Sequence, residues 1–165
     1  METLVTERFR VTLALGMLDA RYRRSVRAAN GEFVVDKSTV VGGVPSVPAP
    51  WDGTLTARYD WPLFHDVKGY VRMEMIVHSH NPGPFTELDP KSINYDPVLR
   101  ADPATDLLNL QLGMTCGLSD ITLFVDNALD SQPNLQRDVD APGSSLMYAY
   151  TFEPRTIGVR ANLRF

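Results

Sequence analysis

The sequence predicts an all-β protein: an antiparallel transmembrane β-barrel segment of about six to eight strands, which is an incomplete barrel. Three observations support this fold class. Apolar and polar residues alternate with a period of two, short and long connections alternate along the chain, and the last strand ends on an aromatic residue, Phe165. A membrane barrel strand turns every second side chain toward lipid and the others toward the lumen, so alternation is its signature.

Six segments carry this alternation, with apolar side chains at every second position. They are residues 9–17, 54–61, 71–78, 108–115, 121–126 and 156–165. No charge interrupts their apolar rows, as expected where a lipid-facing Arg or Lys costs about 2–4 kcal/mol. The opposite rows hold the predicted lumen-facing polar residues, which are Arg10, Arg58, Arg72, Glu74, Asp126, Arg160 and Arg164. So many charges exclude a dry core on that side.

The connections fall into two length classes. Residues 62–69 and 117–120 are short, whereas 23–52, 79–106 and 128–153 are long and rich in Pro, Gly, Asn, Asp and Ser. Short turns at one end and long loops at the other are the arrangement of bacterial outer-membrane barrels. We therefore expect the short turns to be periplasmic and the protein to reside in the cell outer membrane.

Aromatic residues sharpen this orientation. Four of them share outward parity near the expected periplasmic end, namely Phe9, Tyr59, Trp61 and Phe165. Amphipathic rings favour the level of the lipid headgroups, so this set predicts an aromatic girdle.

Two stretches within the long loops, 32–36 and 146–152, are expected to extend as hairpin arms. Tyr148, Tyr150 and Phe152 are candidates for the outer interface.

Composition excludes several other classes. The 165 residues carry a net charge of −4, and no basic stripe suggests nucleic acid as a partner. The single cysteine, Cys116, excludes an intrachain disulfide framework. No apolar run is long enough for a transmembrane helix, and no signal peptide is recognisable at the N-terminus.

Candidate sites for other chemistry are weak. His78 and His80 lie two residues apart on one strand face, a spacing at which both can bind one metal ion. The favoured interpretation is that they are polar residues at the mouth of the lumen. Asp89, Asp96 and Asp102 match no compact calcium loop, and solvated loop charges are the better interpretation. No nucleophile, histidine and carboxylate arrangement stands out, so we predict neither an enzyme nor a bound cofactor.

Asn127 is interpreted as a turn device, with contact to a ligand as the alternative. The inward arginines allow two readings. They attract an anionic substrate such as an iron chelate, or they pair with acids in a hydrated lumen.

Several short motifs occur in an order that resembles the C-terminal β-barrel portion of a TonB-dependent outer-membrane receptor. They are LDARY at 18–22, VP at 44–45 with Pro48, ARYD at 57–60, NLQLG at 109–113, FVDNALD at 124–130, PRTIG at 154–158, and the terminal Arg164-Phe165. The resemblance covers nearly the whole chain. It implies uptake of scarce nutrients such as iron-siderophore complexes, vitamin B12 or oligosaccharides.

The resemblance also implies partners and a signal. In this family the barrel-assembly machinery recognises the closing strand, and that role falls here to Ile157, Val159, Ala161, Leu163 and Phe165. The other expected partners are outer-membrane lipid and, in the full-length receptor only, the TonB energising complex. Residues 1–165 would then form one barrel portion without a plug domain, a fragment whose unpaired edges need a partner.

Two alternatives remain open. A soluble β-sandwich or lipocalin-like binding module would also alternate, but it would not require the girdle or the segregated loop lengths. A complete eight-stranded barrel or a small outer-membrane enzyme would use 32–36 and 146–152 as additional membrane strands.

Overall fold

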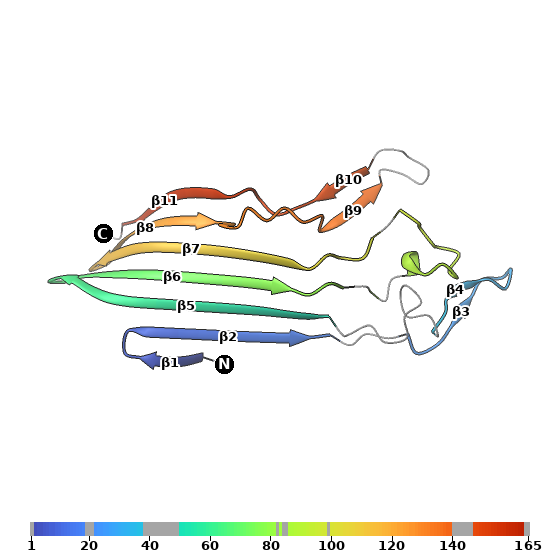
Figure 1. Cartoon of the computed structure of the whole chain (residues 1–165), viewed down its shortest axis with the longest axis horizontal. Coiled ribbons are helices and arrows are strands. Elements are labelled where there is room, and N and C mark those ends of the chain that lie inside the picture. Colours follow the sequence, from blue (N-terminus) through green and yellow to red (C-terminus); the bar gives the residue numbers. More distant parts are fainter. Residues whose placement is uncertain are drawn as a thin grey trace.

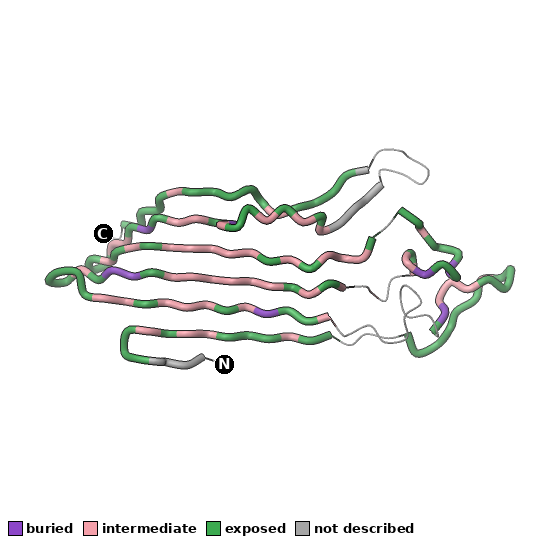
Figure 2. The backbone as a smooth tube through the Cα atoms, viewed as in Figure 1, coloured by how far each residue is buried: buried purple, intermediate pink, exposed green. Residues whose placement is uncertain are grey.

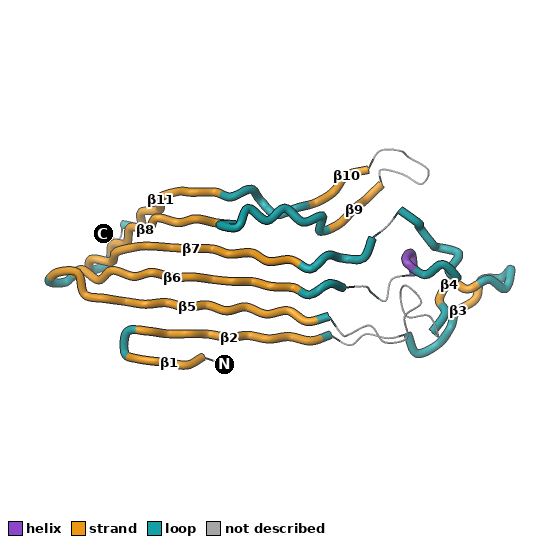
Figure 3. Tube along the Cα trace, viewed as in Figure 1, coloured by secondary structure: helices purple, strands orange, loops and turns teal. Residues whose placement is uncertain are grey.

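The computed structural model describes residues 2–18, 22–37, 50–81, 83, 86–98, 100–139 and 147–163. This part of the chain is built of strands and one short 3-10 turn, η2 (Thr86–Leu88) (Figure 3). The strands are β1 (Glu2–Thr6), β2 (Phe9–Met17), β3 (Val26–Arg27), β4 (Phe33–Val35), β5 (Trp51–Phe64), β6 (Val67–His78), β7 (Thr105–Cys116), β8 (Ser119–Asp126), β9 (Gln136–Val139), β10 (Met147–Tyr150) and β11 (Thr156–Asn162). Among the residues described, no helix has the length and apolarity to span a bilayer.

One large antiparallel sheet dominates the molecule. Its seven strands follow the order β1-β2-β5-β6-β7-β8-β11 (Figure 1). Apart from the strands of the two small separate sheets, strands that follow one another along the chain are therefore neighbours in this sheet. The prediction of an all-β antiparallel fold is therefore confirmed. The sheet is open within the described residues, because β1 and β11 each pair on one side only and not with each other. A closed barrel is thus not formed by this part of the chain.

Tight two-residue turns gather at one end of the sheet, on the left in Figure 1. They are Glu7-Arg8, His65-Asp66 and Gly117-Leu118. His65 and Gly117 adopt positive φ angles of 43° and 56°, as the two-residue hairpin turns that fit the twist of a sheet require. β5 and β6 are longer than predicted, because they continue almost to the tip of the segment 62–69 that was expected to be a short turn.

The long loops leave from the opposite end and carry two small hairpins of their own. β3 pairs with β4, and β9 pairs with β10, each as a separate two-stranded sheet. The expected hairpin arms are confirmed. The eight-stranded alternative is wrong, because β4 and β10 pair within their own loops and take no place in the large sheet.

Two of the loops also contact each other. Ile93 donates its backbone N–H to the carbonyl of Phe33 at 2.8 Å, and the Ser92 hydroxyl donates to the carbonyl of Val34 at 3.0 Å. Lys91 lies 3.7 Å from the carboxylate of Asp36, which is buried. The first two long loops therefore form a joint structure beyond the sheet.

Candidate functional site

The apolar side chains of the sheet form one continuous surface. Register brings residues of successive strands directly opposite one another, so each apolar position continues across the sheet. One such row is Phe9, Tyr59, Val71, Leu112, Leu123 and Val159. The next is Val11, Ala57, Met73, Leu110, Val125 and Ile157. Opposed side chains of this kind touch across strands, and the result is an uninterrupted apolar face over β2, β5, β6, β7, β8 and β11.

This apolar face is left uncovered. Leu112, in the middle of the sheet, is 51% exposed, and Val159 on the edge is 69% exposed. Figure 2 shows exposed and half-buried residues along β2, β5, β6, β7, β8 and β11, with buried ones confined to a few positions. The described residues supply no second layer for this face, since the remaining strands form only the two small hairpins.

Three of the predicted girdle residues lie together at the turn end of the apolar face. Phe9 is directly opposite Tyr59, and the rings of Tyr59 and Trp61 stack with centroids 6.0 Å apart. Trp61 faces Gly69 across the strands and covers it, so that a Cβ on Gly69 would meet the indole at 2.6 Å. The fourth girdle residue, Phe165, lies outside the described residues.

An aromatic residue that was not predicted to belong to the girdle lies at the loop end of the same face. Trp51 begins β5 opposite Met17 and shares the outward parity of Trp61, from which it is ten residues distant. The common parity of the two indoles was the available signal. Tyr148 and Tyr150 were the sequence-based candidates for the outer membrane interface. They belong to the β9–β10 hairpin, where their rings pack edge to face.

The closing strand contributes its predicted residues to the same face. Ile157, Val159 and Ala161 lie opposite Val125, Leu123 and Ile121 of β8. Leu163 follows the strand and is 61% exposed. Because β11 is an edge strand, its other side is open within the described part of the chain.

The opposite face holds the predicted polar residues. Arg10, Arg58 and Arg72 lie directly opposite one another in a single cross-strand row. Like charges so placed destabilise a sheet unless they are neutralised. Arg58 donates to Asp60, with Nη2 2.9 Å from Oδ1, and Arg72 pairs with Glu74 at 3.0 Å. These pairs support the reading in which the arginines are balanced by acids.

Aromatic rings also accommodate the arginines on this polar face. The guanidinium of Arg58 lies 4.0 Å from the centre of the Tyr70 ring, and that of Arg160 lies 5.2 Å from Phe124. Asp126 is exposed at the loop end of β8 and does not join these groups, and Arg164 lies outside the described residues. The polar face thus holds its cations by ion pairs along a strand and by stacking across strands.

Tyr70 is the centre of a buried hydrogen-bond network that sequence analysis missed. Its hydroxyl lies 2.5 Å from Oγ1 of Thr122, which in turn donates to Asp120 at 2.8 Å. Both Tyr70 and Thr122 are buried, and Tyr70 is the buried hydrophobic residue of the described chain. Gly113 lies opposite Tyr70 and leaves room for the ring, since a Cβ there would meet it at 2.5 Å.

Asn127 acts as a structural anchor of the third long loop. It is 2% exposed, and its side-chain amide donates to the carbonyls of Ser131 and Glu153, both at 2.9 Å. Its side-chain oxygen accepts the backbone N–H of Ser131 at 2.9 Å. Its φ of 50° fits the turn device that the sequence predicted. With the amide atoms so engaged, a contact to a ligand is disfavoured.

The weak metal candidates are not assembled. Within the described residues, no three His, Cys, Asp or Glu side chains are grouped to hold a metal ion. Asp89 accepts the backbone N–H of Lys91, and Asp96 accepts that of Val98, so these acids cap their own turns. Cys116 is exposed next to the Gly117 turn, on the outward side as its parity predicts.

In comparisons with protein-family models, with curated proteins and with solved structures, nothing matches this chain. The function of the chain is therefore inferred from the two faces of the sheet, from the separation of turns and loops to opposite ends, and from the motif resemblance.

Proposed function

We propose that this chain forms part of the wall of a bacterial outer-membrane β-barrel that takes up scarce nutrients in the manner of TonB-dependent receptors. The main support for the proposal is that the apolar face of the sheet is exposed, while charged groups on the polar face are partly covered. The central leucine Leu112 is 51% exposed, whereas the side chains of Arg72 and Glu74 are only 28% and 25% exposed. In water, leucine is usually covered and charged groups are exposed. The reversed pattern suits a sheet with lipid on one side and a hydrated lumen on the other.

The spacing of the two indoles supports a membrane of ordinary thickness. Trp51 and Trp61 lie on the same face of β5, ten residues apart, so about 33 Å of strand separates them. Strands of membrane barrels tilt by roughly 35–45°, which reduces this separation to about 25 Å along the membrane normal. That is the height of the outward apolar band in such barrels, and interfacial tryptophans flank that band.

The directions of the two edge strands indicate that a closed barrel would need further strands. The seven strands alternate in direction, so the two edge strands β1 and β11 run the same way. Direct closure of β11 onto β1 would create a parallel pair. An all-antiparallel barrel that contains this sheet therefore needs an odd number of additional strands, which gives the even total typical of bacterial barrels.

We propose that the long loops contact the nutrient. They leave from the end opposite the tight turns, and the first two pack together through the hydrogen bonds of Ser92 and Ile93. By resemblance to the receptor family, this ordered loop structure faces the cell exterior and contacts the nutrient. Import itself would depend on the TonB energising complex in a full-length receptor, and the barrel-assembly machinery would insert the closing strand.

Depth-dependent fluorescence quenching tests the membrane placement. The full chain is refolded into phosphatidylcholine vesicles whose lipids carry a spin label near the headgroup or at the end of the acyl chain. Two single-tryptophan variants, Trp51→Phe and Trp61→Phe, report each site separately. We expect the shallow label to quench both tryptophans more strongly than the deep label, because both indoles flank the apolar band.

A soluble protein would give the opposite result. If neither label quenches either tryptophan and the chain remains a dispersed monomer without detergent, the soluble binding module replaces our proposal. Strong quenching of Trp61 by the deep label would also contradict the placement of the girdle.

A further inference from the structure

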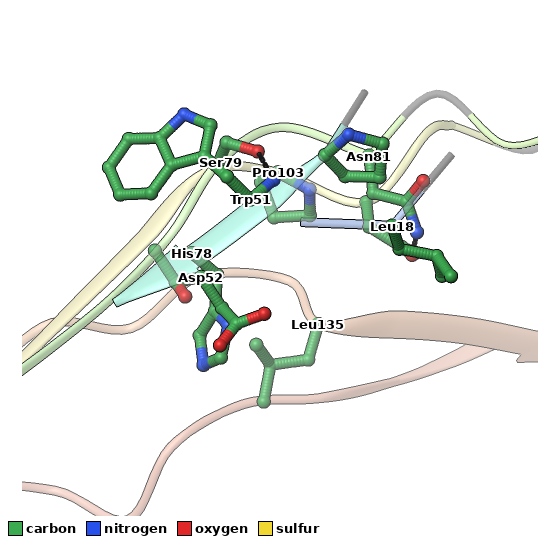
Figure 4. Close-up of a pocket in the computed structure, with 11 residues that line it drawn as sticks. Leu18, Trp51, Asp52, His78, Ser79, Asn81, Pro103 and Leu135 are labelled. Carbon is green, nitrogen blue, oxygen red and sulfur yellow. Dashed lines mark hydrogen bonds between the residues drawn. The ribbon is translucent and has the colours of Figure 1, made fainter. Parts of the chain in front are cut away.

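A pocket of about 320 Å³ lies where the bases of the three long loops meet the sheet (Figure 4). Its wall comes from segments far apart in the chain. Leu18 and Asp52 flank the first long loop, His78 and Asn81 come from the start of the second, and Leu135 comes from the third. Its volume is at the lower end of the range for small-molecule sites, so it suits a compact ligand.

Backbone hydrogen bonds hold the wall in place. Leu18 donates to the carbonyl of Pro50 at 3.0 Å, and Leu135 donates to that of Tyr150 at 2.8 Å. The β5–β6 side is closed by two bonds, from the N–H of Trp51 to Oγ of Ser79 at 2.8 Å and from the N–H of Ser79 to the carbonyl of Trp51 at 2.9 Å. These contacts join residues of the chain itself and fix the positions of the groups that line the pocket, as expected for a preorganised site.

The upper rim is fixed in the same way. Asn81 and Asp102 exchange two backbone hydrogen bonds of 3.0 and 3.1 Å, and the Asn81 side-chain amide donates to Oδ2 of Asp102 at 3.2 Å. The Asp102 carboxylate is therefore already engaged on one oxygen.

Two polar side chains remain available inside the pocket. Asp52 and His78 are direct cross-strand partners, and Figure 4 shows both pointing into the space that Leu135 faces. Neither side chain makes a hydrogen bond or an ion pair with the described residues. The Asp52 carboxylate lies over Gly16, where a Cβ would meet its Oδ1 at 2.6 Å, so the glycine permits its position.

The charged groups around the pocket indicate the sign of the charge that a ligand would carry. Asp52 and Asp102 are its charged groups, and no Lys or Arg is among the described residues that line it. The arginine row begins six residues further along β5, about 20 Å away. A cation is thus favoured at the pocket and an anion is not. Leu18, Leu135 and two prolines offer apolar surface for the rest of the ligand.

We propose that this pocket binds a small molecule that combines a protonated amine with a compact apolar body, with Asp52 as the counter-ion of the amine. His78 supplies a hydrogen-bonding group beside it, and the leucines contact the apolar body. The site is independent of the membrane placement, since it uses only loop bases and the polar face of the sheet.

Three probes of matched size test the proposal: phenethylamine, 2-phenylethanol and phenylacetate. Binding to the full chain in detergent is measured by isothermal titration calorimetry. We expect phenethylamine to bind most tightly and phenylacetate most weakly. Asp52→Asn should weaken phenethylamine about fivefold, as expected for an ion pair near the surface, and should leave 2-phenylethanol unchanged.

Matched variants separate this effect from partition into detergent. Asp66→Asn removes the same charge from an exposed turn at the opposite end of the sheet and should change nothing. Gly16→Ala keeps the charge but displaces the carboxylate, and it should weaken the amine as Asp52→Asn does. Equal affinity for amine and alcohol would overturn the proposal. So would Zn²⁺ binding that depends on both Asp52 and His78 without any amine binding, because the pocket would then be a metal site.

Discussion

The two faces of the large sheet are made by the same strands and are covered in opposite ways. On one face, Leu112 and Val159 both lie opposite Leu123 and are exposed. On the other face, Arg58 and Arg72 are held by carboxylates, and Tyr70 is buried in a hydrogen-bond network. The difference teaches that contacts within the chain organise the polar groups of this sheet, whereas the described residues leave its apolar groups largely exposed.

Aromatic residues differ between the faces in the same way. On the apolar face, Trp51 and Trp61 stand near the two ends of β5. On the polar face, Tyr70 and Phe124 lie over glycines of the neighbouring strands, and each receives a guanidinium. The two tryptophans of the apolar face therefore mark the ends of β5, while the rings of Tyr70 and Phe124 on the polar face fill space and contact charges.

Placing an arginine on the apolar face should be the most damaging change. Leu112→Arg should lower the free energy of unfolding in lipid vesicles by about 2–4 kcal/mol, because the charge would enter the hydrocarbon near its centre. The matched control is Thr56→Arg, which adds the same group to the polar face, opposite Thr12 and Glu74. Urea unfolding of the vesicle-inserted chain measures both variants. Similar losses in the two variants would mean that the faces do not differ in environment.

Filling the space above Gly113 should disturb the polar face to a smaller extent. Gly113→Ala should cost about 1–3 kcal/mol of unfolding free energy, because its Cβ overlaps the Tyr70 ring and displaces the hydroxyl from Thr122. In a Tyr70→Ala background the same substitution should be nearly neutral. A double-mutant cycle in denaturant gives the coupling between the two residues, and strict additivity would contradict the contact.

Removing one acid from the arginine row should have the smallest effect. Asp60→Asn leaves Arg58 between Arg10 and Arg72 without its carboxylate, yet the pair is about one-third exposed. We expect a loss of at most about 1 kcal/mol that shrinks as salt rises, because exposed ion pairs are weak and screened. Asp66→Asn is the control. A loss that does not vary between low and high salt would contradict an electrostatic origin.

Much of the fold could be predicted from the alternation of residues. A period of two assigns each side chain of a strand to one face, so the apolar face with Leu112 and Ile157 and the polar face with Arg58 and Arg160 follow directly from the sequence. The Pro-, Gly- and Asn-rich stretches likewise predict which connections are long. The two separate hairpins confirm the expected arms.

The contacts across strands could not be predicted, because alternation says nothing about the offset between neighbouring strands. The arginine row, the placement of Tyr70 over Gly113 and the pairing of Asp52 with His78 all depend on that offset. Asp60 was overlooked for a different reason: nothing in a sequence shows which carboxylate an arginine selects.

The sequence by itself determined the strand class, the two faces and the end at which each connection lies, since these depend on residue order alone. Only the tertiary structure decided the register, the positions of β1 and β11 as the edge strands of the described sheet, the hydrogen bonds of Asn127 and the pocket beneath the loops. These features join residues far apart in the chain, and their geometry is set by turn length and cross-strand packing together.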